Sequence, residues 1–149
     1  MSDDLPTDHL VALADELRDL LGSGGWLDPA DAPQLTVDYR GAYSGVPVLI
    51  ARPDTVEDLR GVVRSCAAAG VAVVSQRGHT SLSGGSVPTD ERPSVLLSTS
   101  RLNRITSVDP ARFTITVEAG CTIEQVQQAA AAVDRHLGMD WGARGTATV

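Results

Sequence analysis

A strand, a helix and a second strand follow one another between residues 46 and 75, and this unit restricts the possible folds more than any other part of the sequence. Val46 to Ala51 is a short apolar run, typical of a buried strand. Thr55 is placed to cap a helix, and Gly70 is placed to end it. Val71 to Ser75 is a second apolar run. Because a crossover of about 30 residues joins two parallel strands, we predict a parallel pair with a helix on one face.

The amino-terminal part contains a second helical pattern. Leucines at three- and four-residue steps predict a helix over residues 8–21, and the Gly-, Pro- and Asp-rich stretch 22–45 is interpreted as loop. The side chains expected to face the core from the helix that Thr55 caps are Val56, Leu59, Val62, Val63 and Cys66.

Shorter elements follow the loop at residues 76–93. Strands are predicted at 95–97, 105–108 and 113–118, the last two as an antiparallel pair, with Phe113, Ile115 and Val117 facing inward. Thr122 and Gln125 form a capping box that opens a helix running to about Leu137, with His136 in its last turn. The fold class is therefore α+β, a small mixed sheet flanked by helices.

Composition excludes several function classes. With 149 residues, 42% of them apolar, the chain can form one globular core. Its net charge of −7 has the wrong sign for nucleic-acid binding, and no apolar run approaches the ~20 residues of a membrane span. The sequence has no signal-peptide pattern, and Cys66 and Cys121 have no pairing partner at zinc or CxxC spacing, so we expect a reduced, cytoplasmic chain. Cys121 precedes a helix N-terminus, a position that lowers a thiol pKa, but it has no partner base and we expect it to be inert.

One segment has the composition of an anion site. Residues 76–88, QRGHTSLSGGSVP, directly follow a predicted buried strand and combine three glycines with four hydroxyl side chains and Arg77. A turning backbone of this kind can aim several N–H groups at a phosphate. The alternative is a flexible surface loop in which Gly and Ser only form turns. Common nucleotide and hydrolase motifs are absent, since the chain has no Lys for a Walker A loop, no G-x-G-x-x-G and no G-x-S-x-G.

The same segment resembles the Q-G-G-N-T-G-L-V-G-G-x-V-P loop of FAD-linked 2-hydroxyacid dehydrogenases of the glycolate oxidase/D-lactate dehydrogenase type, within the vanillyl-alcohol oxidase/p-cresol methylhydroxylase superfamily. The resemblance extends over nearly all of the chain from residue 26 and includes the Glu118-Ala119-Gly120 step. It implies an amino-terminal helix and loop over 1–45 and the first part of a PCMH-type FAD-binding domain over 46–149. Because members of this family are several hundred residues long, the chain resembles an amino-terminal piece.

The resemblance also implies the cofactor contacts. The diphosphate of FAD would lie on the loop, and the flavin ring or ribityl chain near the carboxyl-terminal segment. The residues so implicated are Gln76, Arg77, Gly78, His79, Thr80, Ser81, Gly84, Gly85, Gly142, Gly145 and Thr146. Arg77, His79 and Ser81 depart from the family letters Gly, Asn and Gly. We name no catalytic residue and no metal ligand. For Trp141 two roles stay open: packing near the cofactor, or filling a hole in the fold.

The implied reaction is oxidation of a small 2-hydroxy acid, of the D-lactate, glycolate or 2-hydroxyglutarate type, to the 2-keto acid, with an unknown electron acceptor as the other partner. Two alternatives stay open. One is an alcohol or carbohydrate oxidase with covalent flavin, because berberine-bridge-type relatives attach flavin to a His that matches His79. The other is a truncated FAD- or anion-binding module that does not turn over.

Overall fold

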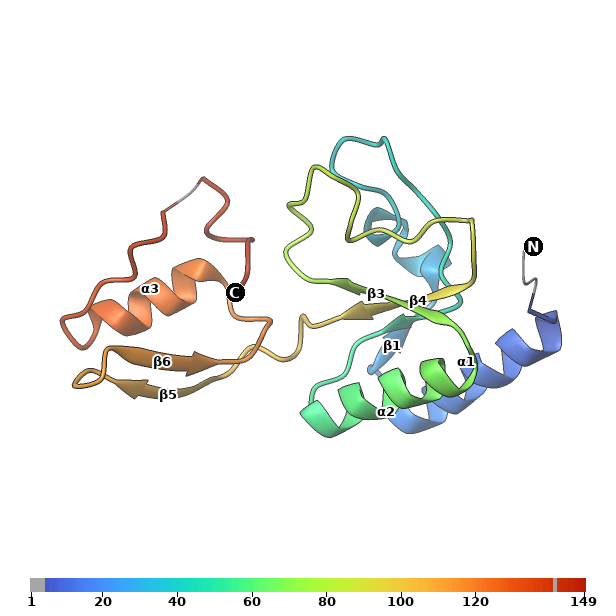
Figure 1. The fold of residues 1–149 in the computed structure, drawn as a ribbon, viewed down its shortest axis with the longest axis horizontal. Helices are drawn as coiled ribbons and strands as arrows, with labels where there is room; N and C mark the ends of the chain where they lie inside the picture. The colour runs from blue at the N-terminus through green and yellow to red at the C-terminus, as the bar shows by residue number, and fades with distance from the viewer. Residues whose placement is uncertain (1–4, 141) are drawn as a thin grey trace.

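A computed structural model describes residues 5–140 and 142–149, and Trp141 lies outside this part of the chain. The ribbon has two lobes (Figure 1). The larger lobe contains helix α1 (Thr7–Leu21), strand β1 (Trp26–Leu27), two 3-10 turns (Pro29–Asp31 and Pro33–Leu35), β2 (Ile50–Ala51), α2 (Val56–Ala68), β3 (Ala72–Gln76) and β4 (Ser94–Ser98). The smaller lobe contains β5 (Ile105–Asp109), β6 (Thr114–Val117) and α3 (Ile123–Ala131).

The sheet of the larger lobe has the order β1-β2-β4-β3. Strand β4 lies between the two strands of the predicted unit and is parallel to both, with Leu96 opposite Ile50 on one side and opposite Val74 on the other. The β2–α2–β3 crossover therefore skips one strand position. The α+β class and the mixed sheet are confirmed, because β1 is antiparallel to β2.

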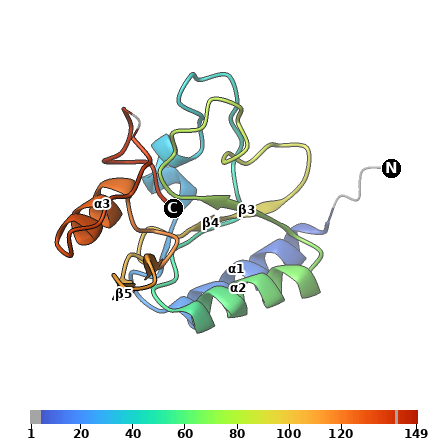
Figure 2. The same cartoon turned by 60° about the vertical axis from the view of Figure 1, so that its left-hand side comes forward.

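Alternation along the strands sends side chains to two cores. Leu49, Ala51, Val95 and Leu97 pack with α1 and α2 on one face of the sheet. Ile50 and Leu96 point to the other face, where they meet Ala32 of the 3-10 segment. In both views the helices lie below the sheet and the long loops above it (Figures 1 and 2). The long loops, including the Gly/Ser-rich loop, therefore lie on the side of the sheet that α1 and α2 do not cover.

Three expectations for the larger lobe are wrong in part. The stretch 22–45 is not all loop, since it contains β1 and both 3-10 turns. The strand predicted over 46–51 is reduced to β2, because Val46 is 74% exposed and Pro47 has no N–H to donate to a neighbour. On α2, Val56 and Val63 are exposed, because α1 covers a narrower stripe centred on the fully buried Val62 and Cys66.

The smaller lobe packs α3 on the antiparallel β5–β6 hairpin, as expected for these strands. The capping box is confirmed: Gln125 N donates to Thr122 Oγ1, and Thr122 N donates to the Gln125 side chain at 2.8 Å. Helix α3 nevertheless ends at Ala131, six residues before Leu137, because the chain reverses at Asp134 with φ 56°.

Two side-chain predictions in this lobe are wrong, because each residue lies outside the element in which it was predicted. Phe113 has φ 57° and is 77% exposed at the hairpin tip rather than facing inward, and the Arg135 guanidinium stacks on its ring at 4.7 Å. His136 lies beyond the end of α3 rather than in its last turn. None of the helices in the described residues has the length and apolar character of a membrane span.

Candidate functional site

The Gly/Ser-rich loop rises from the carboxyl end of β3 on the loop side of the sheet (Figure 1). Gln76, at the base of the loop, is 4% exposed, and its side-chain Nε2 donates to the carbonyl oxygens of Leu35 (2.9 Å) and Ser86 (2.8 Å). It joins the two ends of the loop to the 3-10 segment. Both amide hydrogens are therefore used inside the protein, and the Gln76 side chain has no donor left for a ligand.

The next residues carry unused donors. None of the backbone N–H groups from Gly78 to Leu82 donates a hydrogen bond to another described residue. Thr80 is exposed, and Ser81 and Ser83 bond each other through their hydroxyls at 3.0 Å. Backbone donors without partners on a glycine-containing loop are the local requirement for an anion nest.

Arg77 points toward the smaller lobe. Its Nε donates to the carbonyl oxygen of Gly120, 3.3 Å away, in the turn after β6. Gly120 is itself in close contact with the chain before β5, since its N–H donates to Leu102 at 2.6 Å. Arg77 therefore links the loop to the second lobe, and it is not directed into solvent.

The structure brings Gly78 against the carboxyl-terminal segment. A Cβ atom at Gly78 would collide with the carbonyl oxygen of Thr146, so the two backbones touch. The terminal segment is fastened to the start of α3, because Ile123 N donates to Ala147 and Val149 N donates to Cys121. The loop and the segment that the sequence assigned to one cofactor are thus adjacent at Gly78 and Thr146. Gly142 and Gly145 are exposed on the same segment and have no close contact with the loop.

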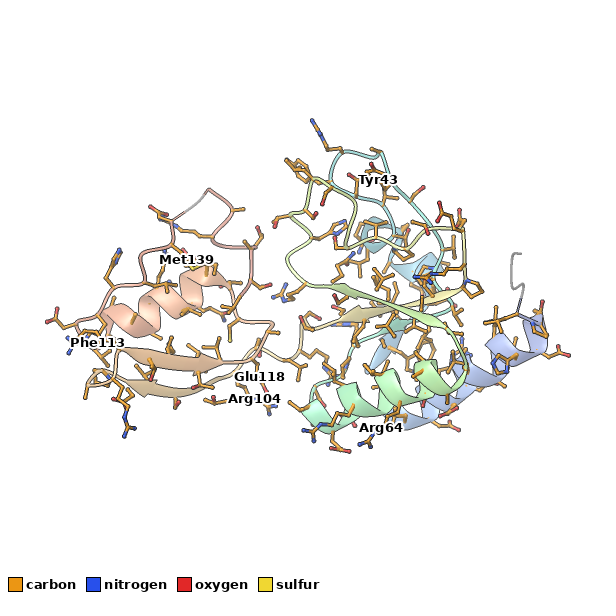
Figure 3. The ribbon with its side chains drawn as sticks, in the orientation of Figure 1. Tyr43, Arg64, Arg104, Phe113, Glu118 and Met139 are labelled. Carbon is orange, nitrogen blue, oxygen red and sulfur yellow. The ribbon has the colours of Figure 1, made fainter. Side chains whose placement is uncertain are left out.

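The loop also contacts a segment that the sequence analysis left as plain loop. His79 has φ 51°, and its Nε2 lies 2.7 Å from the carbonyl oxygen of Val37. Gly84, with φ 73°, lies under the ring of Tyr43, and a Cβ there would be 2.5 Å from Tyr43 Cδ2. Gly85 has open space on that side. Figure 3 shows Tyr43 at the top of the larger lobe, among these loops.

Asp38 organises that segment. It is 5% exposed, and its carboxylate accepts from the backbone N–H groups of Tyr43 (2.7 Å) and Arg40 (3.1 Å). These bonds, the one from Tyr43 first, lower the pKa of Asp38. The sequence carried a signal for it, an Asp three residues before Gly41, which is the pattern of a β-turn.

The thiols of Cys66 and Cys121 are both buried. Burial raises the pKa of Cys66 to about 11 and also raises the pKa of Cys121. For Cys121 this effect exceeds the lowering expected beside a helix N-terminus. Cys66 is buried as expected, and the expectation that Cys121 is inert agrees with its raised pKa, while the expected lowering of that pKa is wrong.

The loop surface is open rather than enclosed, and two cavities lie away from it. One of about 330 Å³ separates the β5–β6 hairpin from the chain after α3, and one of about 1080 Å³ lies between the start of α1 and the chain before β4. The arrangement at the loop suits a long anionic ligand that lies across a surface and contacts both lobes.

Residues 47–149 match the protein family described as FAD binding domain. The chain belongs to this family. Its cofactor is FAD. Similar proteins include D-2-hydroxyglutarate dehydrogenase of Xanthomonas citri pv. viticola, 35% identical over 82% of this chain and 25% of the relative. The mitochondrial D-2-hydroxyglutarate dehydrogenase of Danio rerio is 32% identical over 87% of this chain and 24% of the relative. The chain thus spans about a quarter of these relatives.

Solved structures share the fold of this FAD-binding domain. An alkyldihydroxyacetonephosphate synthase aligns with a TM-score of 0.82 and 18% identity, over 99% of this chain and 30% of the other. A p-cresol methylhydroxylase aligns with a TM-score of 0.72 and 22% identity, over 90% and 27%. The PCMH-type fold expected from the sequence is confirmed.

The residues present fit FAD. The backbone N–H groups from Gly78 to Leu82 have no partner among the described residues, and a pyrophosphate supplies only acceptors. Gly78 permits contact with the second lobe where a side chain would not fit.

Proposed function

We propose that this FAD-binding domain belongs to an oxidoreductase that converts a small 2-hydroxy acid into the 2-keto acid. The relatives named above as D-2-hydroxyglutarate dehydrogenases support this substrate class. The structural observation that carries the flavin part of the proposal is the row of N–H groups from Gly78 to Leu82, unpartnered among the described residues, beside the carboxyl-terminal segment.

In the proposed site, the loop residues Gly78 to Gly85 hold the diphosphate through backbone N–H groups and the hydroxyls of Thr80 and Ser81. Arg77 keeps the loop against the turn at Gly120 and adds positive charge at that edge. Gly142, Gly145 and Thr146 lie toward the flavin end. Gln76 acts by joining the ends of the loop, not by contacting FAD. When bound, FAD supplies the acceptor for the hydride that leaves the substrate.

The substrate and the electron acceptor interact with groups that we do not assign within these residues. A dicarboxylate such as D-2-hydroxyglutarate and a monocarboxylate such as D-lactate are both compatible with the proposal. A cytoplasmic location stays a prediction of the sequence, and the relative from Danio rerio is mitochondrial by name.

The test is a substrate panel on the full-length gene product loaded with FAD. Reduction of an artificial dye is followed with D-2-hydroxyglutarate, D-lactate and glycolate as substrates. The L-enantiomers of the chiral acids are the controls, and simple alcohols and sugars are tested separately as alternative substrates. We expect turnover with at least one 2-hydroxy acid. Turnover with alcohols or sugars alone would favour the covalent-flavin oxidase, and FAD binding without any turnover would favour a binding module.

A further inference from the structure

The segment 36–45 folds over the FAD-binding loop and contacts it at two points. Near the start of the loop, His79 Nε2 bonds the carbonyl oxygen of Val37 at 2.7 Å. Near its end, the Tyr43 ring covers Gly84. Of the unpartnered N–H groups, those of Thr80, Ser81 and Leu82 lie between these two contacts along the chain. The segment therefore holds both ends of the stretch that would meet the diphosphate.

The bond to Val37 determines the form of the His79 ring. A carbonyl oxygen only accepts, so Nε2 must carry the hydrogen in this bond. In the neutral ring Nδ1 then holds a lone pair, and Nδ1 is buried without a partner among the described residues. A phosphate oxygen is an acceptor too and cannot bond that lone pair. In this arrangement the His79 side chain fastens the loop to segment 36–45 and has no donor left for the diphosphate, while the backbone N–H of His79 stays unpartnered among the described residues.

Segment 36–45 is held together by hydrogen bonds to Asp38. Its carboxylate bonds the N–H groups of Tyr43 and Arg40, and its own N–H donates to the Tyr43 carbonyl at 2.9 Å. The turn closes at Gly41, whose N–H donates to the Asp38 carbonyl and whose φ is 69°. Asp38 thus fixes the positions of Val37 and Tyr43, the two residues that contact the loop.

We propose that segment 36–45 is a clamp that holds the FAD-binding loop in its binding conformation, and that Asp38 and His79 are positioning residues for the cofactor. This inference rests on the proposed function, since it takes FAD as the ligand of the loop. A loop held in place before binding loses less conformational entropy when the ligand arrives, and the affinity for FAD is correspondingly higher.

The experiment compares the full-length gene product with five variants: His79→Ala, His79→Gln, Asp38→Asn, the double variant His79→Ala/Asp38→Asn, and Asp28→Asn. Asp28 is the matched control, because it also caps a short turn, through a 2.9 Å bond from Ala30 N, and makes none of the hydrogen bonds that join the loop to segment 36–45. Two quantities are measured: hydrogen exchange of the peptide covering 36–45 in the FAD-free protein, and the dissociation constant of FAD.

We expect His79→Ala to speed exchange in 36–45, some 40 positions away along the chain, and to weaken FAD binding roughly fivefold, the size of one hydrogen bond. Asp38→Asn should do the same, and the double variant should be no worse than the stronger single one. His79→Gln should lose less of both than His79→Ala, because the Gln amide nitrogen lies about as far along the side chain as His Nε2 and can donate to Val37. Asp28→Asn should change neither quantity.

Unchanged exchange in 36–45 for His79→Ala would overturn the clamp. Faster exchange with unchanged FAD affinity would overturn its role in binding. If the unaltered protein bound no FAD, the proposed function would fail together with the cofactor part of this inference, while exchange would still report whether the two segments are coupled.

Discussion

Gly78 and Gly85 stand in the same loop, both without positive φ, but their surroundings differ. A methyl group at Gly78 meets the backbone of Thr146, which cannot move aside without shifting the terminal segment. At Gly85 the nearest atom to such a methyl group is Ser83 Oγ at 4.0 Å. The backbone approach at Gly78 is therefore a requirement of the fold, and the glycine at position 85 is not.

We predict that Gly78→Ala lowers the free energy of unfolding by about 1–3 kcal/mol, the usual range for overpacking, and weakens FAD binding because the loop and the terminal segment separate. Gly85→Ala is the matched control and should leave the unfolding midpoint nearly unchanged. Thermal unfolding followed by circular dichroism and a flavin titration measure the two effects. Equal losses in both variants would contradict this account.

His79 also decides how the flavin is held. Because Nε2 is bonded to Val37 and Nδ1 is buried, neither nitrogen is open to a flavin ring in this structure. We predict a non-covalent cofactor: acid denaturation of the FAD-loaded, full-length gene product should release all of the flavin into the supernatant. Yellow fluorescence that stays with the polypeptide on a denaturing gel, and disappears in His79→Asn, would show the covalent form instead.

At the scale of elements, the hairpin is joined to the larger lobe by charged side chains. Glu118, after β6, accepts from Arg104 N at 2.8 Å and from the Arg104 guanidinium at 2.8–3.1 Å. Arg104 also donates to the Asp54 carbonyl, and Arg101 pairs with the Asp54 carboxylate at 2.6 Å. Figure 3 shows Arg104 and Glu118 between the lobes. These contacts set the relative position of the two lobes that meet at Gly78.

The Arg104 side chain is the first cause that lowers the pKa of Glu118 below its ordinary value. A carboxyl with a lowered pKa in the folded state adds stability above its ordinary pKa and loses it as the pH falls through the lowered value. We predict that Glu118→Gln is less stable than the unaltered protein at pH 7 and that this difference shrinks below about pH 4. Urea unfolding at several pH values measures it.

Glu57→Gln is the control for that series. Glu57 pairs with Arg60 and Arg64 on the exposed face of α2, where both partners are mostly in water, so its loss should have little effect at any pH. A difference for Glu118→Gln that did not depend on pH would contradict the assigned role of the carboxylate.

At the scale of the whole molecule, the surface proposed to bind FAD is open and extends over both lobes. Only one side of a long cofactor would be covered by the described loop and terminal segment, and ordering them has an entropic cost. We predict that these 149 residues by themselves bind FAD weakly and do not reduce a dye with any 2-hydroxy acid. Flavin fluorescence titration and a dye assay test this, and turnover by the isolated residues would contradict it.

The local elements could be predicted from the sequence because their causes lie within a few residues. Thr122 and Gln125 are three positions apart and form the predicted capping box, and the spacing of apolar residues placed α1, α2 and the β5–β6 pair. The Gly/Ser-rich loop was also recognised from its letters, which resemble those of the family that the chain belongs to.

Only the tertiary structure decided what depends on contacts distant in sequence. The helical spacing of apolar residues continues past Ala131, because residues after α3 still line the cavity beside the hairpin. The end of the helix could therefore not be predicted from that spacing. The insertion of β4 between β2 and β3 depends on pairing that no local pattern encodes. The same holds at the Gly/Ser-rich loop, where Val37 meets His79 and Thr146 meets Gly78. A sequence pattern describes neighbours along the chain, whereas these contacts depend on how the folded lobes bring separate segments together.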